Sequence, residues 1–141
     1  MPSTTRFRSF PRALAKKIHN LSSDSIYLML TNVAPVISNT VKSNLSEIAA
    51  GGGYTANGFA LTRLSFDDGA STGIWRLFLQ DYTFTPTGAV GTWQYAANYN
   101  FTATNKELIC WADYGVPIAL SGSSDPFTFQ FDQVNGVLWG G

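Results

Sequence analysis

Residues 127–132 read Phe-Thr-Phe-Gln-Phe-Asp, which is the clearest strand pattern in the sequence. Successive side chains of a β-strand point to opposite faces, so this alternation puts three phenylalanines on one face and polar residues on the other. A second segment, Ile26–Thr31, is apolar and flanked by polar residues, and its length favours a buried strand over a helix. Together the two segments predict a sheet with an apolar core.

Strand patterns of the same kind fill most of the chain after residue 54. β-branched and aromatic residues are concentrated in five further segments: 60–66, 74–85, 92–102, 107–114 and 137–139. Turn signals stand between them at Asp67-Asp68-Gly69 and Asn135-Gly136. Roughly seven short strands at this spacing predict an all-β fold, an antiparallel β-sandwich of jelly-roll or immunoglobulin-like type.

Apolar residues spaced three or four apart predict two short helices beside the strands. In the first, Pro11 suits the opening turn and Leu14, Ile18 and Leu21 share one face, so residues 12–21 are expected to be helical. The second has an apolar face, a capping pair and three glycines that end it. Its face consists of Val41, Leu45 and Ile48, its capping pair of Asn44 and Glu47, and its end of Gly51, Gly52 and Gly53.

The net charge of zero conceals an uneven distribution along the chain. Residues 1–23 contain five basic residues and no acidic one, whereas the remainder contains four basic and nine acidic residues, a net charge of −5. We therefore predict a basic N-terminal arm with a short helix at 1–23 and a β-sandwich domain at 24–141. Such opposite charges favour head-to-tail contact between copies, or docking of the arm on an acidic neighbour.

The length of 141 residues suits one domain with a substantial hydrophobic core. Charged residues make up 13% of the chain, about half the usual fraction, so we expect partner proteins to cover part of the surface. No apolar run is long enough to span a bilayer and the N-terminus lacks the apolar segment of a secretion signal. These features predict a protein of the cell interior without membrane contact, and the single cysteine, Cys110, cannot form an internal disulfide.

Catalytic groups usually come in pairs, and this sequence has one histidine and one cysteine. His19 lies in the basic helix, where a solvated or packing role is expected. Cys110 lies in a predicted strand, where it is expected to be buried. No zinc-ligand spacing or phosphate-binding glycine motif occurs. We therefore predict no enzymatic activity, no catalytic residue, no metal site, no cofactor and no small-molecule substrate.

The carboxylates and the aromatic residues each leave another function open: hydrolysis or calcium binding for the first, sugar binding for the second. A hydrolase would need two acids about 5 to 10 Å apart in a cleft, and Asp67-Asp68-Gly69 could supply calcium ligands, although a turn explains this stretch better. Trp93, Tyr95 and Trp111 could form an exposed platform for sugars, although most aromatics here alternate as core side chains do. Nucleic-acid binding is disfavoured for the acidic body, and only the arm could contact phosphates.

Three parts of the sequence together form a recognisable order of segments. The first is Lys-Ile-His-Asn-Leu (17–21) followed by Asp-Ser-Ile-Tyr-Leu-Met-Leu-Thr (24–31), and the second is Leu-Ser-Glu-Ile (45–48) followed by Gly-Tyr-Thr-Ala-Asn-Gly-Phe-Ala-Leu (53–61). The third comprises Glu-Leu-Ile-Cys-Trp-Ala-Asp-Tyr-Gly (107–115), Phe-Thr-Phe-Gln-Phe-Asp (127–132) and Asn-Gly-Val-Leu (135–138). In these parts the chain resembles small virion structural proteins of tailed bacteriophages, and the resemblance implies a β-sandwich that decorates or cements a virion, on the outside of the capsid shell.

The leading hypothesis is therefore a phage virion structural protein, a capsid decoration or cement protein that stabilises the shell of a virion assembled in the host cytoplasm. Its expected partners are the major capsid protein and copies of itself, for instance in a trimer. Arginine and aromatic side chains dominate interfaces, so the arm residues expected to bind the capsid or a neighbouring copy are Arg6, Phe7, Arg8, Phe10, Arg12, Lys16 and Lys17. The alternative is a tail-tip or fibre module that binds host saccharide through Trp93, Tyr95 and Trp111.

Overall fold

Strands dominate the structure, which confirms the all-β prediction. The computed structural model describes residues 2–67 and 73–140. Within these residues the helical elements are α1 (Phe10–Ala15) and a single 3-10 turn, η1 (Lys42–Asn44). The strands are β1 (Thr4–Arg6), β2 (Ile26–Thr31), β3 (Phe59–Ala60), β4 (Arg63–Asp67), β5 (Trp75–Leu79), β6 (Tyr82–Phe84), β7 (Trp93–Asn100), β8 (Leu108–Ile118), β9 (Phe127–Phe129) and β10 (Leu138–Gly140).

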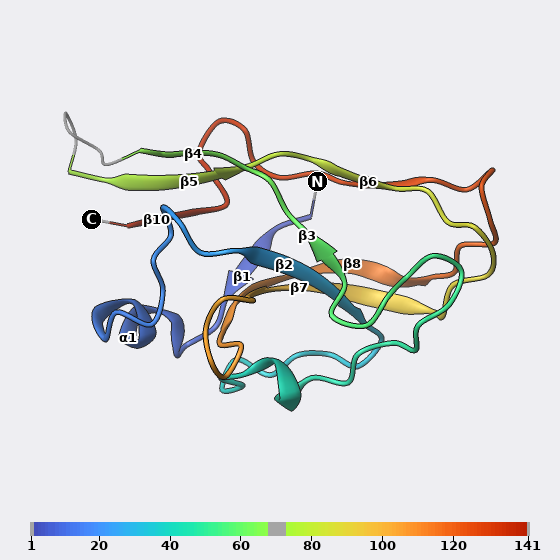
Figure 1. Ribbon diagram of the computed structural model, residues 1–141, viewed down its shortest axis with the longest axis horizontal. Coiled ribbons are helices and arrows are strands. Elements are labelled where there is room, and N and C mark those ends of the chain that lie inside the picture. The colour runs from blue at the N-terminus through green and yellow to red at the C-terminus, as the bar shows by residue number, and fades with distance from the viewer. Residues whose placement is uncertain (1, 68–72, 141) are drawn as a thin grey trace.

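The strands form antiparallel sheets in two layers, as the sandwich prediction requires. A five-stranded sheet has the order β1-β8-β7-β2-β3, a three-stranded sheet the order β10-β5-β4, and β6 pairs with β9. Figure 1 shows β4, β5, β6 and β10 above the larger sheet, so the two small sheets together form the second layer. The segment between β2 and β3, which includes η1, lies under the larger sheet.

Two apolar clusters fill the space between the layers. One lies under β6 and β9 and contains Leu28, Leu30, Trp93 and Phe129. The other lies under the three-stranded sheet and contains the buried side chains Phe10, Leu21, Ile26, Leu77, Leu79, Ile109, Cys110 and Leu138. Each fully buried Leu or Phe contributes roughly 1.5–3 kcal/mol relative to an exposed one, so these clusters provide most of the driving force for folding.

β2 is buried on both faces, which explains why its sequence is apolar throughout. Leu28 and Leu30 face the inter-layer core, whereas Met29 belongs to a third cluster on the opposite face, with Phe7, Ala97, Tyr99 and Leu108. The segment after β2 covers this opposite face, and Leu45 packs against the third cluster. The prediction of a buried strand at Ile26–Thr31 is therefore confirmed.

The first helix is shorter than the predicted range 12–21. It begins at Phe10, with Pro11 in its first turn, and it ends at Ala15 because Lys17 has a left-handed backbone conformation with φ of 62°. The amides of Lys17 and Ile18 donate to the carbonyl oxygens of Leu14 and Ala13, at 3.1 and 2.9 Å, which is a Schellman ending. The early stop lets Leu21 turn back into the core beside Phe10, where a continued helix would have carried it past.

The predicted helix through Val41, Leu45 and Ile48 is absent, and in its place the described chain has the single turn η1. The Asn44 side-chain oxygen accepts hydrogen bonds from the amides of Thr40 and Val41, at 3.0 and 3.1 Å, and so caps the start of this turn, which ends at Leu45 because the backbone there is extended. Residues 45–48 then run extended beside β2, and the Ile48 amide donates to the Leu30 carbonyl at 3.0 Å.

The predicted pairing of Asn44 with Glu47 as helix caps is also wrong, since each side chain bonds elsewhere. The three glycines do not end a helix. Gly51 and Tyr54 instead exchange two backbone hydrogen bonds, at 2.9 and 3.0 Å, and so close a tight turn.

Several predicted strands are interrupted. The segment 74–85 is two strands, β5 and β6, and the segment 60–66 is divided between β3 and β4. β9 ends at Phe129, although the side chain of Phe131 still packs against the core. The turn predicted at Asp67-Asp68-Gly69 falls partly outside the described residues. The break between β3 and β4 lies where the chain passes from the five-stranded to the three-stranded sheet, and the break between β5 and β6 lies where it passes from one small sheet to the other. Periodicity along the chain does not register such a change of sheet.

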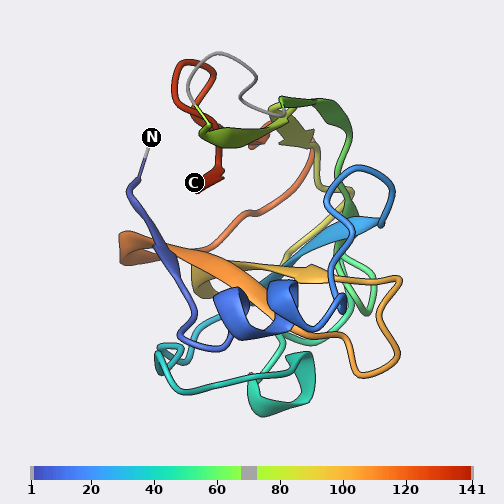
Figure 2. The same ribbon diagram turned by 90° about the vertical axis from the view of Figure 1, so that its left-hand side faces the viewer.

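The N-terminal segment does not extend away from the body as an arm. β1 pairs antiparallel with β8, Thr4 opposite Ala112 and Arg6 opposite Cys110, and Figure 2 shows it running across β8 before the chain enters α1. Phe7 and Phe10 are 1% and 0% exposed, and both belong to the core clusters. Residues 2–23 are therefore packed as part of the sandwich, contrary to the predicted boundary at residue 23.

Candidate functional site

His19 and Cys110 are both buried and both have structural surroundings. The Phe10 ring stacks on the His19 imidazole with 5.3 Å between centroids, and the Asn100 side-chain amide donates to His19 Nδ1 at 3.0 Å. Cys110 is 0% exposed, and burial raises the pKa of its thiol to about 12. Of the two roles expected for His19, solvated or packing, the structure shows packing, and the buried position expected for Cys110 is confirmed.

The described residues contain neither a cluster of metal ligands nor a helix that could span a membrane. In residues 2–67 and 73–140 no group of three or more His, Cys, Asp or Glu side chains comes close enough to hold a metal ion. Over the same residues, neither helical element has the length and apolar character needed to cross a membrane.

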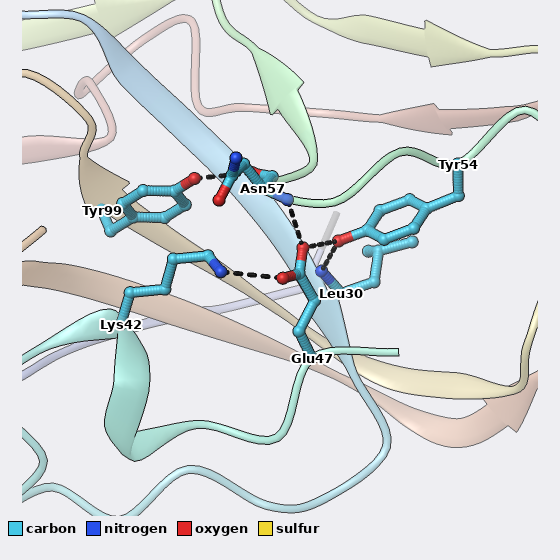
Figure 3. Close-up of polar contacts among 6 residues, drawn as sticks. All are labelled: Leu30, Lys42, Glu47, Tyr54, Asn57 and Tyr99. Atoms are coloured by element: carbon cyan, nitrogen blue, oxygen red, sulfur yellow. Dashed lines mark hydrogen bonds and ion pairs between the residues drawn. The ribbon is translucent and has the colours of Figure 1, made fainter. Parts of the chain in front are cut away.

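A polar cluster that links several elements is centred on Glu47 (Figure 3). Its Oε1 accepts hydrogen bonds from the Tyr54 hydroxyl and the Asn57 amide, both at 2.8 Å, and its Oε2 pairs with Lys42 Nζ at 2.7 Å. The Tyr54 hydroxyl in turn accepts a hydrogen bond from the Leu30 amide at 3.1 Å. One carboxylate thus connects η1, the turn at Tyr54 and the central strand β2.

The contacts of the Glu47 cluster connect separate parts of the chain. The Tyr99 hydroxyl donates to the Asn57 carbonyl oxygen at 2.7 Å, which adds β7 to the connection. Burial raises the pKa of both Tyr54 and Tyr99 well above the usual range, so both hydroxyls stay protonated and act as donors. Because the carboxylate oxygens already accept three hydrogen bonds, we infer that the Glu47 cluster holds the segment between β2 and β3, which we call the cover segment, on the five-stranded sheet.

The predicted arm residues separate into two groups. Phe7 and Phe10 are core side chains, so their predicted contact with a neighbour is wrong. The basic residues of the segment remain at the surface: Arg6, Arg8, Arg12, Lys16 and Lys17. Alternation along β1 explains the difference, since Phe7 continues the strand with its side chain turned inward while Arg6 and Arg8 point outward.

The three aromatics predicted as a sugar platform do not share a surface. Trp93 is 0% exposed and packs against Tyr114, Phe127 and Phe129, so its predicted exposure is wrong. Trp111 is half-buried against Phe7 on the opposite face of the five-stranded sheet, with ring centroids 4.5 Å apart. Tyr95 is also half-buried. These positions exclude a common platform.

A different tryptophan is exposed. Trp139 in β10 is 59% exposed, more than any other aromatic side chain among the described residues. Its cross-strand neighbour is Arg76 in β5, and Arg6 of β1 donates to the Trp139 carbonyl oxygen at 3.4 Å. Leu138 points into the core, so alternation in a paired strand turns Trp139 outward, a placement that required knowing where β10 pairs.

Shallow depressions border Trp139 on two sides. One is lined by Ile74, Arg76, Asp132, Asn135 and Trp139, and the other by Thr4, Arg6, Val137, Leu138 and Trp139. We call Arg6, Arg76, Asp132, Asn135 and Trp139 the Trp139 surface. It combines elements from both ends of the chain, which explains why no single stretch of sequence indicated it.

The charges of the Trp139 surface are held at defined positions. Within the described residues the ion pair is Lys42–Glu47, so neither Arg6 nor Arg76 is paired with a carboxylate there. Asp132 accepts hydrogen bonds from the amides of Asn135 and Val134, both at 2.8 Å, and these bonds lower the pKa of its carboxyl. The surface therefore offers an indole, two guanidinium groups and one fixed carboxylate to a ligand.

Comparison with known proteins adds no relative: no protein-family model, no curated protein and no solved structure matches this chain.

Proposed function

We propose that this chain is a structural protein of a tailed-bacteriophage virion that binds the outer surface of the capsid and stabilises the shell, as a decoration or cement protein. The sequence resemblance of residues 17–31, 45–61 and 107–138 supports the virion assignment, and the β-sandwich fold agrees with what that resemblance implies. The proposal differs from the sequence-based hypothesis in its attachment surface, which is the Trp139 surface and no longer a free arm.

The exposure of Trp139 is the observation that carries this proposal. An exposed tryptophan is costly in water, and covering it would remove roughly 100–150 Å² of apolar surface, worth about 3 kcal/mol. Tryptophan and arginine are also the residue types that contribute most to protein interfaces. Trp139 with Arg6 and Arg76 has the composition of such an interface centre.

The two guanidinium groups indicate the chemistry of the partner. Arginine forms paired hydrogen bonds with carboxylates, so Arg6 and Arg76 favour a capsid surface that presents Asp or Glu around an apolar recess for Trp139. Asp132 lines the same depression as Arg76 and would repel a misaligned acidic group, which contributes to orientation.

Binding to particles that lack this protein would test the proposal. The variant Trp139→Ala should lower the affinity about 100-fold, the equivalent of about 3 kcal/mol, because the indole is the main apolar contact. Val33→Ala is the matched control, since Val33 is 58% exposed and lies beyond β2 in the cover segment. If Trp139→Ala occupies particles as fully as Val33→Ala does, the Trp139 surface is not the attachment site.

A second candidate is a tail-tip or fibre module that binds host saccharide. The observation in its favour is the exposed Trp139 indole next to Asp132 and Asn135, since sugars stack on aromatic rings and bond to carboxylate and amide groups. A glycan array probed with the wild-type chain and with Trp139→Ala separates the two candidates. Glycan binding that disappears with Trp139 would favour this candidate over capsid attachment.

A further inference from the structure

Exposed basic side chains gather at one end of the molecule. Arg12 lies on α1, Lys16 and Lys17 follow it at the helix end, and Arg8 precedes it, and all four are exposed. None of these four is ion-paired within residues 2–67 and 73–140. The helix lies at one end of the long axis in Figure 1, so the positive charge that the sequence places in its first 23 residues is also concentrated in space.

The same end exposes apolar side chains. The Arg8 amide donates to the Ile37 carbonyl oxygen at 3.1 Å, which holds the loop before η1 against the start of the chain. In this loop Val36 and Ile37 are 56% and 44% exposed. We call Arg8, Arg12, Lys16, Lys17, Val36 and Ile37 the basic end.

Acidic side chains lie at the other end of the same sheet. β8 pairs with β1 through residues 110–112, next to the basic end, and then runs on to Ile118, so Asp113 lies at its middle and Val116 in its far half. Asp125 is brought to the same side because the rings of Tyr114, which follows Asp113, and Phe127, two residues after Asp125, lie 5.4 Å apart. We call Asp113, Val116 and Asp125 the acidic end.

Hydrogen bonds favour the ionised form of Asp113 in the acidic end, which also has an apolar component. Hydrogen bonds from the Gln94 side chain and the Gly115 amide, at 3.0 and 2.7 Å, lower the pKa of the Asp113 carboxyl. Val116 is 62% exposed beside it. The two ends therefore match in kind, since each combines charge of one sign with exposed aliphatic side chains.

We propose that copies of this chain associate head to tail, with the basic end of one copy on the acidic end of the next. Opposite charges steer and orient such a contact, and burial of Val36 and Ile37 against Val116 adds an apolar part. Because the two surfaces differ, the contact is heterologous and generates a ring or an open row of copies. The inference rests on the proposed function for its place on a particle, but the contact itself requires no capsid.

The isolated full chain provides the test. Sedimentation of the wild type in about 20 mM salt should give a mean mass well above the 15.3 kDa of one chain, and about 500 mM salt should return it towards one chain, since salt screens surface charges. The double variant Arg12→Gln with Lys16→Gln should stay a monomer at low salt. The matched control is Thr104→Glu with Asn105→Glu, which makes the same change in net charge at exposed residues outside both ends and should associate like the wild type.

Charge reversal makes the test specific for this pairing. The variant Arg12→Glu with Lys16→Glu leaves the basic end without net charge, and the variant Asp113→Lys with Asp125→Lys makes the acidic end positive, so each variant alone should be monomeric. An equimolar mixture should associate in pairs, since the unaltered basic end of the second variant can bind the unaltered acidic end of the first. Circular dichroism of each variant confirms that it is folded.

Two results would overturn the inference: a wild type that is monomeric at low salt, or association that neither salt nor the Arg12 and Lys16 changes affect. The capsid-binding experiment with Trp139→Ala tests a different surface, so either proposal can fail while the other holds.

Discussion

The imidazole of His19 lies against Phe10 and accepts a hydrogen bond at Nδ1 from the Asn100 amide. A side-chain amide nitrogen only donates, so this bond requires a neutral imidazole with its proton on Nε2. Burial lowers the pKa of His19 below 6.5, against the smaller opposing effects of Glu107 and Asp24, both of which raise it. Protonation of His19 would place an N–H group on Nδ1 opposite the Asn100 amide N–H, so that two donors would meet without an acceptor.

The stability of the protein should consequently fall as the pH drops below about 6.5. Above that value neither state is protonated at His19, whereas below it the unfolded chain takes up a proton that the folded chain resists. Urea unfolding at a series of pH values between about 7.5 and 5.5 would measure the slope. His19 is the only histidine in the sequence, so His19→Asn, whose side-chain oxygen can still accept from Asn100, should flatten the dependence. An unchanged slope in that variant would assign the pH dependence to other groups.

Glu47 is the residue on which the cover segment depends. Replacement by Ala would leave the Asn57 amide, the Tyr54 hydroxyl and Lys42 without their acceptor, and we expect a loss of about 2 kcal/mol in the free energy of unfolding. Glu47→Gln is the control, since it keeps an acceptor oxygen and should cost less. Denaturant titration measures both, and equal losses would mean that the charge of Glu47 matters and its hydrogen bonds do not.

β1 is held to the sheet by three residue pairs and by the side chain of Phe7 behind them. Phe7→Ala should therefore lower the free energy of unfolding by about 3–5 kcal/mol, as large-to-small changes of buried phenylalanines do. The neighbouring Arg8→Ala should change it by less than about 0.5 kcal/mol, because Arg8 is exposed. If both variants are as stable as the wild type, the N-terminal segment is not docked in solution.

The elements differ in how far their sequences specify them. β2 is predicted correctly because it is a continuous apolar run in the middle of the large sheet, and β7 because Trp93, Tyr95 and Tyr99 mark it as a strand. The helix at residues 41–48 was predicted wrongly because its apolar spacing serves another purpose: Leu45 and Ile48 each contact the sheet from an extended chain. Spacing of three or four residues reports a shared face only if the chain is helical, and here the backbone is extended from Leu45.

Cys110 lies in the centre of the molecule, between the two layers, and reports on the stability of the whole fold. It is 0% exposed with a pKa raised to about 12, so a thiol reagent can reach it only when the sandwich opens. Labelling of the native protein should be at least about 1,000-fold slower than labelling in denaturant. The variant Ser43→Cys, at an exposed position, should label at once at its new thiol. Fast labelling of Cys110 itself would show that β8 opens locally.

Periodicity along the chain is enough to establish the class of this fold and its buried strands. The pleat of a strand turns alternate side chains to opposite faces whatever the rest of the molecule does, so Phe127, Phe129 and Ile26–Thr31 carry that information locally. The uneven charge is likewise a property of the sequence alone.

Which side chains reach the surface depends on the order and register of strands that are distant in sequence. Trp93 is covered by Phe127 and Phe129, and Phe7 by Trp111, whereas Trp139 at the edge of the small sheet is left exposed beside Arg76 and Arg6. Phe7, Trp93 and Trp139 are all aromatic residues in or next to strands, and no local sequence pattern distinguishes the exposed one from the two buried ones. Burial is a property of the packed layers, so the candidate binding surface emerges only when residues 6, 76 and 139 are brought together.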